Sequence, residues 1–155
     1  MNDAQLLQYF QNQQTQSGWF ALLHTMVENM VANVGESQSH AFLTQMGDDL
    51  GKRFPLPLSN TVCELETAIN NQLARFNWGY IDIDASETAL LIRHRALPTP
   101  SDEARQTAWS HAMSAVLEGL YARWLQSQGG KPTVALWRES APSATEVHFR
   151  YQNSR

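Results

Sequence analysis

The stretch that decides the fold is Val116-Leu-Glu-Gly-Leu-Tyr-Ala-Arg-Trp-Leu-Gln-Ser-Gln-Gly-Gly130. Its apolar residues recur at helical spacing back to Trp109, which predicts one long helix over residues 103–128. Gly129-Gly130 supplies the C-cap. A buried helix does not need Gly119 in its interior, where glycine costs roughly 1 kcal/mol relative to alanine. Gly119 therefore predicts a close approach of this helix at an interface or against a sheet.

Two β-hairpins flank the long helix. Apolar residues alternate with polar ones in residues 78–84 and 88–95, which is the period of a half-buried strand. The same alternation over residues 133–138 and 145–151 predicts a second hairpin, with its turn through residues 141–143. Together the hairpins predict a small antiparallel sheet.

The N-terminal half is predicted to be helical. An apolar stripe predicts a helix over residues 18–34 that ends at Gly35. A second helix follows, with Ser37 or Ser39 as its N-cap, and stops at Phe54-Pro-Leu-Pro57 because proline cannot continue a helix. The residues predicted to be buried are Phe20, Leu23, Val27, Met30 and Val34 in the first helix and Phe42, Met46 and Leu50 in the second.

Thr61-x-x-Glu64 is a capping box that predicts a third helix. Its apolar stripe is Leu65, Ile69, Leu73 and Phe76. The predicted fold class is α+β: an N-terminal helical half plus a small antiparallel sheet of two hairpins packed on one long helix.

The first 17 residues predict an oligomerisation arm and linker. Leu6, Leu7 and Phe10 form a short apolar stripe, and the polar segment 11–17 follows as a mobile linker. A helix this short is marginal alone in water, so its stripe needs a surface on its own domain or on a neighbouring copy of the chain. Residues 18–155 are predicted to form a single α+β domain.

The composition disfavours nucleic-acid binding. The formal net charge is −4 and only 17% of the residues are charged, so the chain lacks the clustered Lys and Arg of a nucleic-acid-binding surface. A polar surface rich in neutral amides and hydroxyls suits carbohydrate or protein partners instead.

The predicted compartment is the cytoplasm. Cys63 is the only cysteine, so no intrachain disulfide can form. The N-terminus has no basic and apolar regions of a secretory signal, and no apolar run reaches the roughly 20 residues of a membrane span.

The sequence carries little catalytic chemistry. Asp82 and Asp84 share one strand face about 7 Å apart, within the range of the paired carboxylates of glycosidases. Nothing beside them signals the burial that raises the pKa of a catalytic acid, so the polar face of a strand is the preferred interpretation. The five histidines and one cysteine show no metal-ligand spacing, and no cofactor motif occurs. Trp78, Tyr80 and Trp137 are candidates for stacking on sugar rings, although core or interface positions are the preferred interpretation.

The chain resembles the family of the D subunit of bacterial cellulose synthase. The most specific match is Leu-Glu-Gly-Leu-Tyr-x-Arg-Trp at 117–124. The other matching features are Gly51-x-Arg53, Pro55, Pro57, Leu65, Asn70, Trp78-Gly79 and Leu91-x-x-x-x-x-Leu97-Pro98. They cover residues 47–151, about two thirds of the chain.

The resemblance implies a non-catalytic accessory of cellulose secretion that assembles dimers into a ring-shaped octamer. It implies that Met1, Asn2, Asp3, Ala4 and Gln5 line passages for glucan chains, although Asp3 places a negative charge there. It also implies oligomer contacts, which we assign to Leu6, Leu7, Phe10, Gly119, Tyr121 and Trp124.

The expected partners are further copies of the chain, other cellulose synthase subunits, a proline-rich protein and glucan, with neither metal nor cofactor. The expected location is the cytoplasmic side of the inner membrane, with the periplasm as the alternative. Two other functions stay open at this point. One is a binding module with a lipid or haem pocket between helix and sheet, adapted by Met26, Met30, Met46 and Met113. The other is a glycosidase that uses Asp82 and Asp84.

Overall fold

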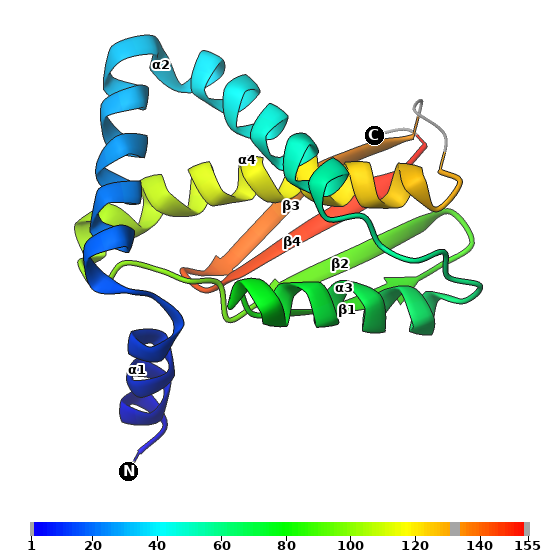
Figure 1. Cartoon of the computed structure of the whole chain (residues 1–155), viewed down its shortest axis with the longest axis horizontal. Helices are drawn as coiled ribbons and strands as arrows, with labels where there is room; N and C mark the ends of the chain where they lie inside the picture. Colours follow the sequence, from blue (N-terminus) through cyan, green and yellow to red (C-terminus); the bar gives the residue numbers. More distant parts are fainter. Residues whose placement is uncertain (1, 131–133, 154–155) are drawn as a thin grey trace.

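The computed structural model describes residues 2–130 and 134–153. Its helices and strands follow one another as shown in Figure 1: α1 (Asp3–Gln14), α2 (Ser17–Arg53), α3 (Val62–Phe76), β1 (Tyr80–Ala85), β2 (Ala89–Arg95), α4 (Glu103–Ser127), β3 (Ala135–Ser143) and β4 (Glu146–Gln152). Among the predicted site residues, Met1 lies outside the described residues.

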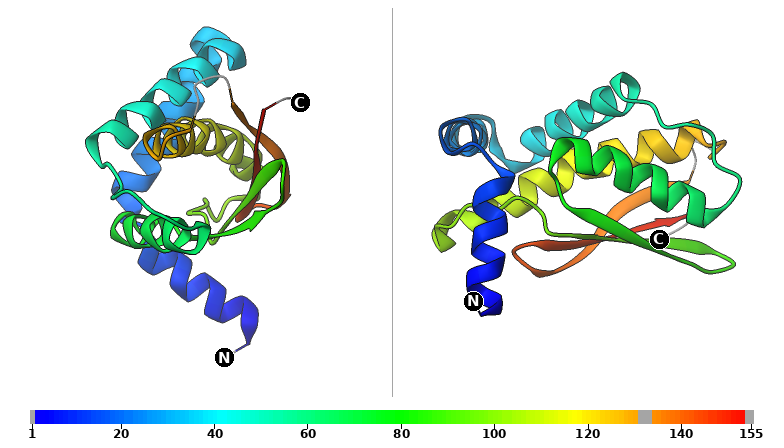
Figure 2. Two further views of the ribbon diagram at one scale, coloured as in Figure 1. Left: turned by 90° about the vertical axis from the view of Figure 1, so that its right-hand side faces the viewer. Right: turned by 60° about the horizontal axis from the view of Figure 1, so that its bottom comes forward.

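The four strands form one antiparallel sheet in the order β1-β2-β4-β3. Strands β1 and β2 make the first hairpin, and β3 and β4 make the second. Helices α3 and α4 lie on one face of this sheet, and α2 lies on the far side of α4 (Figure 2). The predicted α+β class is therefore confirmed, with α2 as an additional layer that encloses the long helix.

Helix α4 is enclosed on most sides. Leu117, Tyr121 and Trp124 are fully buried, and Ala115 on another side is almost as well covered. This enclosure follows from the three layers, because the sheet takes one side of α4 and α2 takes another. A capping residue holds the start of the helix, since Asp102 accepts a hydrogen bond from the amide of Ala104 at 3.0 Å.

Helix α2 changes direction at Gly35, whose φ of 83° is a left-handed value that favours glycine. The predicted break at Gly35 is therefore confirmed. The prediction that Ser37 or Ser39 caps the following helix is wrong, because α2 is helical from residue 36 onward. Ser39 is instead buried against α4, in the region where the two helices approach each other.

The predicted buried face of α2 is partly wrong. Phe42 and Met46 are exposed, whereas Leu43 and Gly47, one position along, are buried. The physical reason is that small residues let α2 lie close to α4, so the face with the larger side chains points away. In the first half of α2, Leu23 and Val34 are likewise exposed, while Phe20 and Val27 pack against the core.

Side chains of α3 cover the free edge of β1. The amide group of Asn70 donates to the carbonyl of Ile81 at 2.9 Å and accepts from its amide at 2.7 Å. Glu66 accepts from the amide of Ile83 at 2.9 Å. These bonds occupy groups that an additional strand would need, so this edge is protected from strand pairing.

The second hairpin differs from its prediction. Residues 141–143, predicted to form the turn, belong to β3, which contains two register shifts between Arg138 and Ser143. Strand β3 lies at the edge of the sheet, where bulges and Pro142 are tolerated. The predicted start of this strand at Thr133 lies outside the described residues.

Helix α1 is longer than the sequence predicted. It continues to Gln14, so the predicted mobile linker over residues 11–17 is wrong, and only residues 15 and 16 connect the two helices. Asn2 and Gln5 form a reciprocal capping box at its start, with bonds of 2.8 and 3.1 Å. At its end, the side-chain amide of Gln14 donates to the carbonyl of Ala96 at 2.7 Å.

Candidate functional site

Gly119 lies where α4 crosses α2. A methyl group at this position would overlap the carbonyl oxygen of Thr44 and lie 2.8 Å from the amide nitrogen of Asp48. Gly47 lies opposite, and a methyl group there would overlap the carbonyl of Val116. The close helix approach predicted at Gly119 is present, but its predicted place, at an interface or against the sheet, is wrong, because it joins two helices of one chain.

Tyr121 joins α4 to the sheet through a buried histidine. Its hydroxyl donates to Nδ1 of His94, whose Nε2 donates to the carbonyl of Trp78 at 2.6 Å. Burial lowers the pKa of His94 from 6.5 to about 4, against the opposing effect of the hydrogen bond to Trp78. Burial also raises the pKa of Tyr121. Both groups are therefore neutral at pH 7.

Two further residues of the 117–124 motif, Arg123 and Trp124, tie α4 to α2 and to the loop that follows α2. The indole of Trp124 donates to the carbonyl of Phe54 at 2.9 Å. The guanidinium of Arg123 donates to Asp48 at 2.7 Å, and this bond is the main cause that lowers the pKa of Asp48. The motif at residues 117–124 therefore stabilises the fold of a single chain.

The assignment of Gly119, Tyr121 and Trp124 to an oligomer interface is wrong. Tyr121 and Trp124 are 0% exposed within a single chain, and Gly119 is buried beneath α2. A second copy could not touch these side chains without opening the core. Tyr and Trp are enriched both in cores and at interfaces, so residue type alone could not separate the two locations.

The other predicted interface residues lie on the surface. Leu6, Leu7 and Phe10 of α1 are 43%, 48% and 58% exposed, and Tyr9 beside them is 52% exposed. Helix α1 projects from the body near the start of α2 (Figure 1). The predicted arm therefore carries an apolar stripe that the described part of the chain leaves largely uncovered.

The first half of α2 carries an exposed apolar surface that was not predicted from the sequence. We call its residues the outer stripe: Trp19, Leu22, Leu23 and Met26, which are 67%, 49%, 51% and 56% exposed. An adjacent side of the same helix packs through Phe20 against the ring of Trp109, with ring centroids 5.1 Å apart. A helix that is apolar on two sides needs a second packing partner. The signal was present in the sequence, because positions 19, 22, 23 and 26 have helical spacing.

The structure does not favour a glycosidase site at Asp82 and Asp84. Both carboxylates form ion pairs with the guanidinium of Arg93, and Asp82 also pairs with Arg95 at 3.1 Å. The hydrogen bond from Arg93 to Asp82 is the main cause that raises the pKa of Arg93. A glycosidase needs one carboxyl kept protonated in an apolar site, whereas these two face a permanent cation.

We expect Asp82→Asn to leave cellulose output unchanged and to change the free energy of unfolding by less than about 1 kcal/mol, because the ion pairs are partly exposed. The measurement is cellulose yield from cells that carry only the variant chain. A loss of yield with normal levels of folded protein would restore the enzyme hypothesis.

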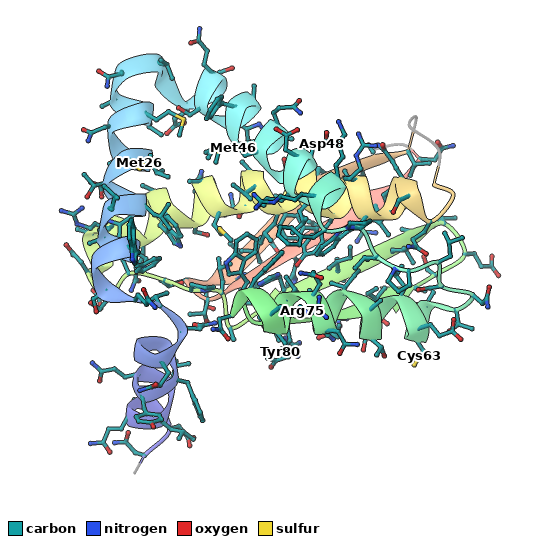
Figure 3. The ribbon with its side chains drawn as sticks, viewed as in Figure 1. Met26, Met46, Asp48, Cys63, Arg75 and Tyr80 are labelled. Carbon is teal, nitrogen blue, oxygen red and sulfur yellow. The ribbon has the colours of Figure 1, made fainter. Side chains whose placement is uncertain are left out.

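The space between α4 and the sheet is filled by side chains. Tyr121 packs edge-on against Phe149 at 5.5 Å, and Leu117 beside them is fully buried. Of the methionines expected to adapt a pocket, Met26 and Met46 lie on separate halves of α2 (Figure 3) and are exposed. The structure therefore gives the lipid or haem hypothesis no support between α4 and the sheet, where the pocket was predicted.

The three candidate aromatics occupy different surroundings. Trp78 packs against Phe76 at 4.9 Å at the edge of the core, and Trp137 is half-buried on β3. Tyr80 is 50% exposed at the start of β1. They do not form one platform, because Tyr80 and Trp137 lie on the two opposite edge strands of the sheet and Trp78 packs into the edge of the core.

Neither a membrane-spanning helix nor a metal cluster occurs in the described part of the chain. Within residues 2–130 and 134–153, no helix has the length and apolar character to span a bilayer. The same residues contain no cluster of three or more His, Cys, Asp or Glu placed to hold a metal ion.

The chain is similar to known proteins of one kind. Residues 5–152 match the family described as the D subunit of cellulose synthase. Cellulose synthase operon protein D of Komagataeibacter xylinus is 40% identical over 91 residues, and that of Komagataeibacter sucrofermentans has the same identity over the same length. Each alignment covers 57% of this chain and 56% of the relative, so the chain spans about half the length of these relatives. Another K. xylinus protein of the same name is 31% identical over 111 residues, which is 70% of this chain and 69% of the relative. The family match extends over nearly the whole chain, and this chain therefore belongs to the cellulose synthase D-subunit family.

Proposed function

We propose that this protein is a non-catalytic accessory subunit of the cellulose synthase machinery, whose dimers assemble into a ring-shaped octamer that organises glucan chains for ordered secretion. The observation that carries the proposal is the outer stripe of α2, together with the apolar stripe of α1. Contiguous exposed apolar patches on a soluble protein mark sites of protein association.

The first turn of α1 is the proposed guide for glucan. Asn2, Ala4 and Gln5 are exposed at the free end of the arm, and Asp3 is the only charged residue of α1. Neutral amide groups can donate and accept hydrogen bonds with the hydroxyl groups of a glucan chain. We include Met1 in the proposed glucan guide on the basis of its position in the sequence.

The proposed partners are other copies of this chain, other subunits of the synthase, a proline-rich protein and glucan. The proposed place of action is the synthase complex at the cytoplasmic side of the inner membrane. Family membership supports an association with the synthase, and the uncovered apolar surface supports an association with further protein.

We expect deletion of residues 1–10 to leave a folded dimer and to weaken the higher assembly. The reason is that this deletion removes the apolar stripe of α1 while the three-layered body keeps its contacts. Light scattering gives the particle mass, and circular dichroism checks the fold. An unchanged mass for the truncated protein would contradict a role for α1 in assembly.

We expect the double variant Trp19→Ser/Met26→Ser to fail to restore cellulose output in cells that lack the native chain. Both substitutions lie on the outer stripe, so they should remove assembly while leaving the core intact. Leu58→Ser is the matched control, because Leu58 is 80% exposed but lies outside α1 and α2. Normal cellulose output from the double variant would contradict the proposed function.

A further inference from the structure

Resting on the proposed function, we propose that α1 of one copy docks lengthwise into a groove between α2 and α4 of a neighbouring copy. We call this the α2–α4 groove. The occupant is thus a segment of this chain, supplied by a second copy.

The α2–α4 groove has a volume of about 820 Å³. Its floor is the small-residue face of α4, which includes Ala104, Ala108 and Ala112. Leu43 of α2 forms an apolar wall, and the small side chains leave room for another helix to approach. The rim is polar and includes His111.

The groove matches α1 in length and chemistry. Its lining on α4 runs from Ala104 to Glu118, about 21 Å at 1.5 Å per residue, and the 12 residues of α1 span about 18 Å. Leu6, Leu7 and Phe10 would meet the alanine floor. Amide side chains that flank this stripe can pair with hydroxyl and imidazole groups of the rim, because amides both donate and accept.

The arm does not reach the groove of its own chain. The bond between Gln14 and Ala96 holds the last turn of α1 beside the body, and only two residues connect α1 to α2. In Figure 1, α1 extends downward from the start of α2, whereas the residues that line the groove belong to the bend of α2 and to α4, both above α1. A second copy therefore has to supply the occupant.

The buried area favours reciprocal exchange over a single contact. Four large side chains of α1 are about half exposed, and each leaves on the order of 100 Å² uncovered. One docked arm would then bury about 800 Å² in total, the size of a crystal-packing contact. Two arms exchanged between two copies that belong to neighbouring dimers would bury about 1,600 Å², the size of a standard specific interface.

Intermolecular cross-linking tests the position of the arm. In a Cys63→Ser background, one population carries Leu7→Cys and a second, of different mass through a tag, carries Ala108→Cys. The two are mixed, re-equilibrated and treated with a short bis-maleimide. We expect a cross-linked product that contains both masses, and its yield should fall at least tenfold when Ala74→Cys, an exposed alanine of α3, replaces Ala108→Cys.

A second variant tests the groove by obstruction. Ala108→Arg should reduce the particle mass to that of the protein without residues 1–10, whereas Ala74→Arg should leave the mass unchanged. Full-size particles from Ala108→Arg, or equal cross-linking at Ala74 and Ala108, would overturn the groove as the docking place and leave the proposed function standing. Monomers from the native chain would overturn both proposals.

Discussion

Gly119→Ala should lower the free energy of unfolding by about 2 kcal/mol. The added methyl group would overlap the backbone carbonyl of Thr44, so α2 and α4 would have to separate. Overpacking of this kind costs about 1–3 kcal/mol, and the higher helix propensity of alanine returns at most roughly 1 kcal/mol. Urea unfolding followed by circular dichroism measures the difference.

Gly18→Ala is the matched control for this substitution. Gly18 lies in the first turn of α2, and a methyl group there would meet no neighbouring atom within 4 Å. Gly18→Ala should therefore show only the gain from the higher helix propensity of alanine and raise the free energy of unfolding slightly. If Gly119→Ala also stabilised the protein, helix propensity would be the sole effect of this glycine and the tight crossing of α2 and α4 would be refuted.

Acid should destabilise the protein through His94. The unfolded chain takes up a proton near pH 6.5, but the buried imidazole does so only near pH 4, so the folded state binds fewer protons between these values. The stabilisation is complete above pH 6.5 and is lost as the pH falls toward 4, by about 3 kcal/mol in total. Urea unfolding at a series of pH values between 4 and 7.5 gives the curve.

Two variants isolate the contribution of His94. His94→Gln keeps a donor for the carbonyl of Trp78 and an acceptor for the hydroxyl of Tyr121 but does not titrate, so it should flatten the curve between pH 4 and 6.5. His148→Gln, a change at a partly exposed histidine of β4, should leave the steep part of the curve in place. A curve for His94→Gln that overlays the native one would show that another group is responsible.

Local periodicity predicted the elements of the fold better than it predicted their environment. The alternation in β1 and β2 and the helical stripe of α4 indicated the first hairpin and the long helix, because one buried face repeats along each element. The same rule misplaced the buried face of α2 by one residue. Gly47 lies where α4 approaches most closely, and a rule based on large side chains does not recognise a glycine as buried.

Of the two exposed apolar stripes, the sequence predicted the one on α1 but not the one on α2. The stripe on α1 is exposed as the assembly hypothesis requires, because so short a helix cannot bury its apolar residues alone. The outer stripe was missed because each helix was expected to have one apolar face, the buried one. His94 gave no sequence signal either, because its role depends on Tyr121, 27 residues away in the chain.

The most direct test of the proposed assembly is the mass of the purified full-length protein in solution, measured by light scattering at micromolar concentration and physiological salt. We predict a single particle of eight times the chain mass of 17.5 kDa. A monodisperse particle of 17.5 kDa would contradict the octamer, because the outer stripe and the stripe of α1 would then be stable without a partner.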